Sequence, residues 1–584
     1  MKIFLKLLLL FFCVNVYANR PIDTQGLHSN NLPNVLSKED INLYKKIINS
    51  QNNGDWEIAN KQTTLINNKI LMGYIEYEKL MHPNKYKATY EELKRWLQKY
   101  NDHPVVLKKR IYNLMLKRAG NQRERSAVKK PKFENYLRGY GENRRIKYTS
   151  KLKTKNFNNT EFNNDILAFL LRQDYEQLAD LKKINIKKFY YGISLAKNIA
   201  DKSFYSGQLK KSYQIYESLI NKVGVEDADI YFKAGVNAYR LNKKVSSKNH
   251  FIKCNKYHEN QNSLDAWHFS GCLFWKSKTE KFNSNNALIK AASFPRTFYG
   301  QLALERLKIK EPFNWKVNKL DFNSQDFDGL MEFASFKRLI ALANLNFYNY
   351  ADLEIRNLYT KIEKHQKTRL FYLSEKLNLA AVLMRLGSTY ENIDQSLYLR
   401  GLYPTPQWKI KSGYILDRAL LYALIRRESA FNFKAKSSKG ARGLMQLMPR
   451  TASKLKNDYS LRYANAYQLY SLDLNLSLGQ KFLKSLIKGP QTGNSLLKTL
   501  IAYNAGIVRL RDWDVRFYKQ NDPILYIESI PIRETRQFVK YIFADMWIYR
   551  DRLKQEKPTR KMLSEGKWPF YKNIDYFLIK DARI

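Results

Sequence analysis

Glu428 is the single acidic residue in the stretch from residue 428 to 448, and the next carboxylate along the chain is Asp458. Serine, glycine, methionine and amide side chains surround it in the sequence. A protonated carboxylic acid can donate its proton to the bridging oxygen of a glycosidic bond, and that oxygen must be protonated as the sugar departs. Glu428 is therefore a candidate general acid for breaking such a bond.

Apolar residues at helical spacing precede Glu428 and predict the helix that must position it. Leu420 and Leu424 lie eight and four residues before the acid, and Asp417 is placed to cap the helix at its N-terminus. The acid therefore falls on the apolar stripe, near the C-terminal end of the helix. Because loss of water and the negative end of the helix dipole both disfavour a charged carboxylate, we predict a raised pKa for Glu428.

The alternative is an ordinary helix-end glutamate that lies at the surface or pairs with the adjacent Arg426 and Arg427. The residues that follow favour a binding site, because they combine glycines that allow close approach, adaptable thioethers and an amide that can bond hydroxyl or acetamido groups. These residues are Gly440, Gly443, Met445, Gln446 and Met448.

Four motifs in this order resemble those of the soluble lytic transglycosylase family, whose goose-lysozyme-like catalytic domain cleaves bacterial peptidoglycan. They span roughly residues 410 to 550, and a match of four ordered motifs is far more specific than a single Glu-Ser pair. The motifs are E-S-A-F-N at 428–432 with Ser437 after it, G-A-R-G-L-M-Q-L-M-P at 440–449, A-Y-N-A-G at 502–506 and E-S-I-P-I-R-E-T-R at 528–536.

The resemblance implies that Glu428 is the sole catalytic acid and base, acting on the β-1,4 bond between N-acetylmuramic acid and N-acetylglucosamine. The acetamido oxygen of the substrate would assist, and the product would be 1,6-anhydromuramic acid. This agrees with the absence of a second local acid, although Asp458, Asp473, Glu528 or Glu534 could fold near the site. The substrate-binding positions that the resemblance implies are Ser437 near the acetamido group, Gln446 and Met448 against the sugar, Tyr503 with its hydroxyl near Glu428, Asn504, and Glu534 lining the cleft.

All seven histidines and all three cysteines precede residue 366. A catalytic His or Cys and an ordinary zinc site are therefore excluded from the C-terminal part. No phosphate loop, dinucleotide fingerprint or EF-hand loop is found, so we expect no cofactor and no metal. Cys254 and Cys272 could form a disulfide across a helical hairpin or remain two buried thiols.

The first residues resemble a secretory signal. Lys2 and Lys6 flank an apolar run from 7 to 14, and Ala18 ends a small-residue cleavage pattern. We expect cleavage after Ala18 and a periplasmic protein; an uncleaved membrane anchor is the alternative, although the apolar run is short for a span.

The chain has 584 residues, too many for one core. Short helical patterns, such as those at 211–220, 228–241 and 298–307, recur from about residue 35 to 330, while β-hairpin signals are scarce. Paired helices of this kind bury their stripes by stacking, so we predict a mainly α protein with a helical solenoid. The family resemblance implies a U-shaped or ring-like helical domain carrying the lysozyme-like domain, with the segment 294–303 joining the helical and linker domains. The predicted units are a signal peptide (1–18), a superhelical domain (19–330), a small helical linker domain (331–400), the catalytic domain (401–550) and a tail (551–584). The tail could dock on the helical domain or on a partner, and docking on its own chain is the default expectation.

A net charge of +49 favours a polyanionic target. Peptidoglycan stem peptides bear carboxylates, so we expect glycan strands as the partner, for a monomer that is soluble or associated with a membrane surface. Proteins of cell-wall synthesis or division are further candidate partners. The basic stretch 108–155 could be interpreted as a nucleic-acid site, but a solvated loop is the simpler interpretation and no nucleic acid is expected.

Two other functions fit the same sequence. One is a hydrolytic muramidase on the same fold, and the other is a non-catalytic scaffold that binds peptidoglycan. The sequence leaves open whether cleavage proceeds from chain ends or internally.

Overall fold

The protein is helical throughout the part of the chain that the computed structural model describes, which comprises residues 33–126, 128–132, 137, 160–261, 265–280, 285–315, 327–517 and 521–575. Extended pairing in these residues is limited to three isolated bridges. The predicted mainly α class is confirmed. None of the helices in these ranges combines the length and the apolar character needed to cross a bilayer. The predicted signal peptide, residues 127, 133–136 and 138–155 of the basic stretch, and Tyr576 and Phe577 of the tail lie outside the described residues.

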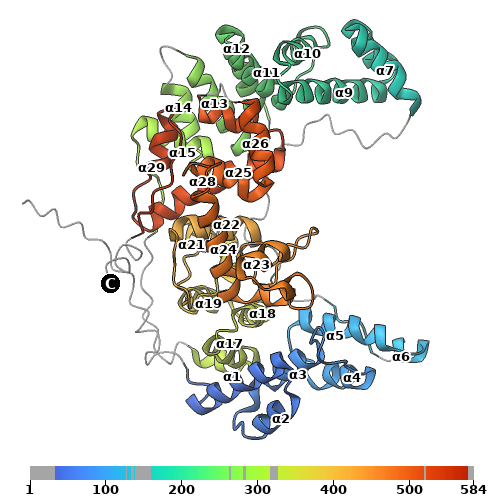
Figure 1. Cartoon of the computed structure of the whole chain (residues 1–584), viewed down its shortest axis with the longest axis vertical. Coiled ribbons are helices and arrows are strands. Elements are labelled where there is room, and N and C mark those ends of the chain that lie inside the picture. Colours follow the sequence, from blue (N-terminus) through green and yellow to red (C-terminus); the bar gives the residue numbers. More distant parts are fainter. Residues whose placement is uncertain are drawn as a thin grey trace, which may run out of the picture.

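The first helices gather at one end of the molecule (Figure 1). Thr89 begins one of them with a capping box, in which its side chain and that of Glu92 bond each other's backbone N–H groups. The helices are α1 (Lys38–Asn53), α2 (Trp56–Thr64), η2 (Lys69–Leu71), α3 (Met72–Leu80), α4 (Tyr90–Lys99), α5 (Val105–Arg118) and α6 (Gln122–Ser126).

The next helices stack one after another at the opposite end of the molecule (Figure 1). Close packing between neighbours depends on small residues: a Cβ on Gly235 would lie 2.7 Å from the ring of Phe251 on the following helix. This consecutive stacking confirms the predicted solenoid arrangement. The helices are α7 (Thr160–Arg172), α8 (Tyr175–Ile184), α9 (Ile186–Tyr205), α10 (Leu209–Asn221), α11 (Ala228–Arg240), α12 (Lys244–Glu259), α13 (Ala266–Thr279), α14 (Asn285–Ala292) and α15 (Phe298–Leu307).

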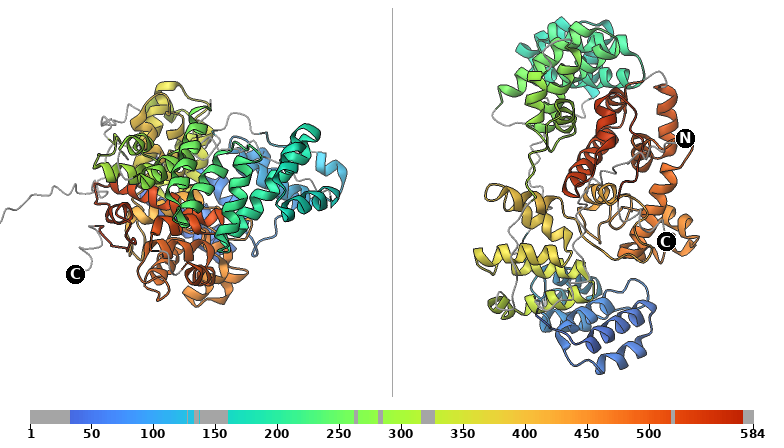
Figure 2. Two further views of the ribbon diagram at one scale, coloured as in Figure 1. Left: turned by 90° about the horizontal axis from the view of Figure 1, so that it is seen from above. Right: turned by 90° about the vertical axis from the view of Figure 1, so that its left-hand side faces the viewer.

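A third group of helices brings the chain back against the first group. Arg338 of α17 pairs with Asp102 at 2.6 Å and with Glu354, whose Oε1 also accepts a hydrogen bond from Tyr74 of α3 at 2.6 Å. Figure 2 shows the two groups side by side. The helices are α16 (Asp328–Met331), α17 (Ala334–Asn344), α18 (Tyr348–Leu358), α19 (Lys364–Lys376), α20 (Ala380–Ser388) and α21 (Gln395–Leu402).

The last group lies between the two ends of the molecule (Figure 1). Its longest helix, α28, packs along α22, which carries Glu428. The elements are α22 (Arg418–Ser429), α23 (Pro449–Lys456), η4 (Tyr459–Arg462), η5 (Ala466–Tyr470), α24 (Leu472–Ile487), α25 (Leu496–Ala505), α26 (Ile507–Arg516), α27 (Pro523–Ser529), α28 (Arg533–Arg552) and α29 (Pro558–Ser564).

The segment 294–303 connects the stacked helices with two other groups. Arg296 donates a hydrogen bond to the hydroxyl of Tyr398 on α21 at 2.8 Å, and Tyr299 donates one to Glu528 of α27 at 2.5 Å. A joining segment was the role predicted for these residues. The boundaries of the predicted domains stay predictions.

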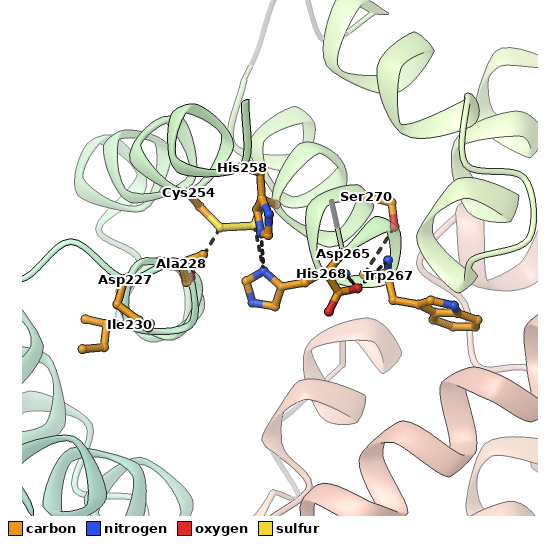
Figure 3. The surroundings of a disulfide bond; sticks show 10 residues. Asp227, Ala228, Ile230, Cys254, His258, Asp265, Trp267, His268 and Ser270 are labelled. Atoms are coloured by element: carbon orange, nitrogen blue, oxygen red, sulfur yellow. Dashed lines mark hydrogen bonds between the residues drawn. A yellow bond between two sulfur atoms is a disulfide. The ribbon is translucent and has the colours of Figure 1, made fainter. Parts of the chain in front are cut away.

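Cys254 and Cys272 form a disulfide between α12 and α13 (Figure 3). Two histidines from the same helices lie beside it: a ring nitrogen of His258 is 2.8 Å from one of His268. Burial lowers the pKa of His258 to about 3, and burial also lowers the pKa of His268, so both rings are neutral.

Candidate active site

Helix α22 positions Glu428 in its last turn, as predicted. Asp417 caps the helix by accepting hydrogen bonds from the N–H groups of Ala419 (2.9 Å) and Leu420 (3.4 Å), which confirms the predicted N-cap. The helix ends at Ser429, and the chain then turns sharply through two residues with positive φ, Ala430 and Phe431. Glu428 is thus held immediately before a fixed reversal of the backbone.

The carboxyl group of Glu428 has the electrostatic character of a proton donor. Burial raises its pKa to about 8, and the nearby carboxylate of Glu534 contributes in the same direction. Within the described part of the chain, the Glu428 carboxylate takes part in no hydrogen bond or ion pair. A carboxylic acid in this environment is protonated at neutral pH.

The adjacent arginines do not neutralise Glu428. Arg426 and Arg427 both pair with Asp545 of α28, the first at 3.1 Å through Nη1 and the second at 2.8 Å through Nη2. The interpretation of Glu428 as an ordinary residue paired with its neighbours is therefore wrong. Asp545 pairs with both guanidinium groups, so they do not offset the raised pKa of Glu428.

The loop after Glu428 is folded tightly by its own hydrogen bonds. Single bridges join Lys436 to Arg442 and Arg442 to Leu447. Gly443 has a φ of 77°, and a Cβ at this position would lie 2.3 Å from both Asn475 Nδ2 and the Leu469 carbonyl. Only glycine allows the backbone to come this close to α24.

Asn475 holds this loop against α24. Its Oδ1 accepts a hydrogen bond from Met445 N at 2.8 Å, and its Nδ2 donates to the carbonyls of Arg442 and Leu469 at 2.9 and 2.8 Å. Asn475 lies outside the four motifs. A buried amide within the apolar run L-D-L-N-L-S-L is the signal that could have identified it.

Three predicted substrate-binding residues lie in or at the end of this loop. Ser437 accepts a hydrogen bond from Ala441 N at 3.0 Å, and Gln446 donates from Nε2 to the carbonyls of Ala435 (3.2 Å) and Gly443 (2.8 Å). Ser437 and Gln446 thus stabilise the loop that carries them. Met448 immediately precedes α23 and is 42% exposed, so its thioether offers an apolar surface.

Tyr503 and Asn504, near the C-terminal end of α25, connect the loop to α28. The Tyr503 hydroxyl donates to the Met445 carbonyl at 2.6 Å, and burial together with the Glu428 carboxylate raises its pKa well above the usual value. Asn504 Oδ1 accepts a hydrogen bond from Thr535 at 2.7 Å. Thr535 follows the exposed Glu534 directly, so this bond fixes the start of α28 beside the site.

The other acids named from the sequence have partners elsewhere. Asp458 pairs with Lys456 at 3.2 Å, Asp473 accepts a hydrogen bond from Lys411 N at 3.0 Å, and Glu528 pairs with Lys540 at 2.8 Å. Among the four acids considered, Glu534 is the one that acts on Glu428.

The C-terminal tail holds the start of α22, another feature that the motifs did not reveal. Asp417 N donates to the hydroxyl of Tyr571 at 3.0 Å, and Arg418 pairs with Asp575 at 2.7 Å. Arg550 donates to Asp417 Oδ2 at 3.0 Å. For residues 551–575, the prediction that the tail docks on its own chain is confirmed, and the tail fixes the helix that carries Glu428.

Comparison with known proteins gives a family match over the same region. Residues 408–525 match the family model described as the transglycosylase SLT domain. The chain is 30% identical over 277 residues to the soluble lytic murein transglycosylase of Escherichia coli strain K12, covering 47% of this chain and 41% of that protein. It is 34% identical over 290 residues to the putative soluble lytic murein transglycosylase of Haemophilus influenzae, covering 49% of this chain and 47% of that protein. The matched region thus spans less than half the length of these relatives.

Among solved structures, the 70 kDa soluble lytic transglycosylase of Escherichia coli aligns with 91% of this chain and 99% of that chain, with a TM-score of 0.48 and 18% identity. The resemblance that the four motifs indicate is confirmed by the family match and by the curated relatives. Residues 408–525 match the transglycosylase SLT domain, and about half of the chain is similar in sequence to soluble lytic murein transglycosylases.

Proposed function

We propose that this protein is a lytic transglycosylase that cleaves the β-1,4 bond between N-acetylmuramic acid and N-acetylglucosamine in peptidoglycan and forms 1,6-anhydromuramic acid. The observation that carries the proposal is the carboxyl group of Glu428, which is protonated at neutral pH and has no ion pair within the described residues. The family match and the relatives, which are named as murein transglycosylases, support the choice of polymer.

Glu428 acts first as an acid and then as a base. Its proton passes to the glycosidic oxygen as the bond from that oxygen to the anomeric carbon breaks, while the acetamido oxygen of the muramic acid bonds to the anomeric carbon. The Glu428 carboxylate then takes the proton of the C6 hydroxyl. The C6 oxygen displaces the acetamido oxygen from the anomeric carbon, which closes the 1,6-anhydro ring, and no water is consumed.

The distribution of acids supports a mechanism with one protein carboxylate. Glycosidases with two catalytic carboxylates place them on opposite sides of the bond that breaks. Asp458, Asp473 and Glu528 are each engaged with other partners. Glu534 instead raises the pKa of Glu428, so we assign it to keeping the acid protonated as well as to lining the substrate cleft.

We assign substrate binding to residues around Glu428. Met448 packs on a sugar face, Ser437 lies near the acetamido group, and Gln446 and Asn504 position polar groups of the sugar. Tyr503 places its hydroxyl near the Glu428 carboxyl, which contributes to the raised pKa of that hydroxyl, and the Met445 carbonyl holds the hydroxyl in position. The target polymer and the signal-like N-terminus support a periplasmic location.

Digestion of purified peptidoglycan sacculi tests this function. We expect the wild-type protein to release fragments with 1,6-anhydro ends, identified by mass spectrometry, and Glu428→Gln to release almost none. Glu565→Gln removes an exposed glutamate in the tail and is the matched control, expected to retain activity. Reducing ends would instead identify a hydrolytic muramidase, and binding without any product would identify a scaffold.

A further inference from the structure

A cluster of four side chains outside the candidate active site combines the ligand types that zinc prefers. Cys254 and His258 lie one turn apart on α12, and His268 and Cys272 lie one turn apart on α13. One ligand atom from each of the four falls within 4.8 Å of the others. Among the described residues, this is the one group of three or more His, Cys, Asp or Glu side chains with such convergence.

The disulfide accounts for only half of this cluster. A disulfide between two helices requires two cysteines at a suitable separation, and the Cα atoms of Cys254 and Cys272 are 6.0 Å apart. It requires no histidine. Nevertheless a nitrogen of His268 lies 2.8 Å from a nitrogen of His258 and 3.6 Å from the sulfur of Cys272 (Figure 3).

We propose that Cys254, His258, His268 and Cys272 form a tetrahedral zinc site when the two cysteines are thiolates, and that the disulfide is the alternative state of the same sulfurs. Two thiolates and two imidazoles are a common ligand set of structural zinc sites, in which all four positions belong to the protein. The site has no open position for substrate and therefore serves to hold α12 and α13 together.

The distances require only small side-chain adjustments. Around a tetrahedral zinc with the usual bond lengths, two nitrogens lie about 3.3 Å apart and two sulfurs about 3.8 Å apart. The histidine nitrogens must therefore separate by about half an ångström, and the sulfurs must rotate apart across a Cα separation of 6.0 Å. The i, i+4 spacing on both helices already directs all four side chains to one point.

The charge of the site also suits its surroundings. Zn²⁺ and two thiolates sum to zero, so the buried site carries no uncompensated charge. Binding releases the two thiol protons, because the metal ligand is the thiolate.

Metal titration of the full chain tests the site. A phosphine reductant first converts the disulfide to thiols: the phosphine takes the oxygen of a water molecule, and two electrons and two protons pass to the sulfurs. We expect the reduced protein to bind one Zn²⁺ in competition with a chromophoric chelator, and the oxidised protein to bind none at this site. With Co²⁺ in place of zinc, we expect the visible bands of tetrahedral cobalt together with a thiolate-to-cobalt charge-transfer band.

Paired variants separate this site from adventitious binding. In the reduced protein, His258→Gln combined with His268→Gln should weaken zinc binding by more than the roughly 10–100-fold cost of losing an outer-shell partner, and the disulfide should still form on oxidation. His250→Gln is the matched control, since His250 lies on the same helix one turn before Cys254 and bonds Glu217 instead. It should leave the zinc affinity unchanged.

Three results would overturn the site: no stoichiometric zinc in the reduced wild type, a cobalt spectrum without the thiolate band, or unchanged affinity in the double variant. If the double variant does not fold, two measurements on the wild-type protein test the site. One is its cobalt spectrum, and the other is alkylation of the reduced protein, in which bound zinc should protect both cysteines. None of these measurements depends on the proposed enzymatic activity.

Discussion

Two glutamates from the same C-terminal part of the chain, Glu428 partly buried and Glu528 buried, have opposite environments. Glu428 lies in the last turn of α22, where burial and Glu534 raise its pKa to about 8. Glu528 lies on α27, where burial opposes ionisation but Lys540 and Arg536 nevertheless hold its pKa below the usual value. Burial alone therefore does not determine what a carboxyl group does. The partner charges leave one acid as a proton donor and make the other part of an interface with α15, through Tyr299.

The largest expected difference between the two acids is in catalysis. Glu428→Gln should reduce the rate of anhydro-product formation by about 10²–10⁴-fold, the usual contribution of a general acid, because the amide has no proton to donate. The folded part of a Glu528→Gln preparation should still form anhydro products in the same sacculus digest. Equal losses of activity in two well-folded variants would show that Glu428 has no special role.

The second difference is in stability. Glu528→Gln leaves Lys540 and Arg536 buried without their carboxylate, so we expect it to lower the free energy of unfolding by about 3 kcal/mol. Glu428→Gln removes a carboxyl that has no ion pair in the described residues. At acidic pH this substitution should change the free energy of unfolding very little. Urea unfolding followed by circular dichroism measures both, with the exposed Glu565→Gln as reference. A Glu528→Gln protein as stable as Glu565→Gln would contradict a stabilising role for the ion pairs of Glu528 with Lys540 and Arg536.

The third prediction concerns the loop that frames Glu428. Gly443→Ala should cost about 1–3 kcal/mol and reduce activity, because it forces both an unfavourable φ and a clash with Asn475 and Leu469. Gly440→Ala is the matched control: its φ of 87° is similarly unfavourable, but its Cβ would meet open space. Thermal unfolding of both variants isolates the contact, and equal losses would show that only φ matters.

The two acids should also make opposite contributions to the pH dependence of stability. The folded protein holds a proton on Glu428 between the ordinary pKa of 4.5 and about 8, so this residue lowers stability as pH rises through that window. The lowered pKa of Glu528 contributes stability above the ordinary value that is lost as pH falls towards the folded value. The Tm of Glu428→Gln relative to wild type should therefore rise between about pH 5 and pH 8. A constant difference in Tm would contradict the raised pKa.

The smallest effect is expected from Glu534. Its charge is the second cause of the raised pKa of Glu428, after burial, so Glu534→Gln should move the alkaline limb of the pH–rate profile to lower pH. Glu534→Asp keeps the charge and should leave the limb near its wild-type position. A profile that does not differ between wild type and Glu534→Gln would remove the electrostatic role assigned to this residue.

Much of the candidate site could be predicted because its signals are local. The spacing of Leu420, Leu424 and Glu428 on one helix and the cap at Asp417 depend only on helical periodicity and on near neighbours. The helical patterns at 211–220, 228–241 and 298–307 correspond to α10, α11 and α15 with ends shifted by at most two residues. Adjacent turns determine such features, so they can be recognised in a linear sequence.

The supporting contacts could not be predicted in the same way. Asp545, which forms ion pairs with Arg426 and Arg427, lies more than a hundred residues after them in the sequence. Asn475 lies about thirty residues after the loop that it holds. The tail residues Tyr571 and Asp575 contact the start of α22 although they lie 154 and 157 residues after their partners in the sequence. No periodicity or spacing rule connects residues so far apart.

The sequence by itself determined the helical class, the acid at position 428 and the family to which its motifs point, because residue types, helical periodicity and motif order are properties of the linear chain. The tertiary structure decided which carboxylates have counter-charges and which do not, and it brought Cys254, His258, His268 and Cys272 to one point. The physical reason is that the pKa of a carboxyl group and the formation of a metal site both depend on groups within a few ångströms in space, and folding alone brings those groups together.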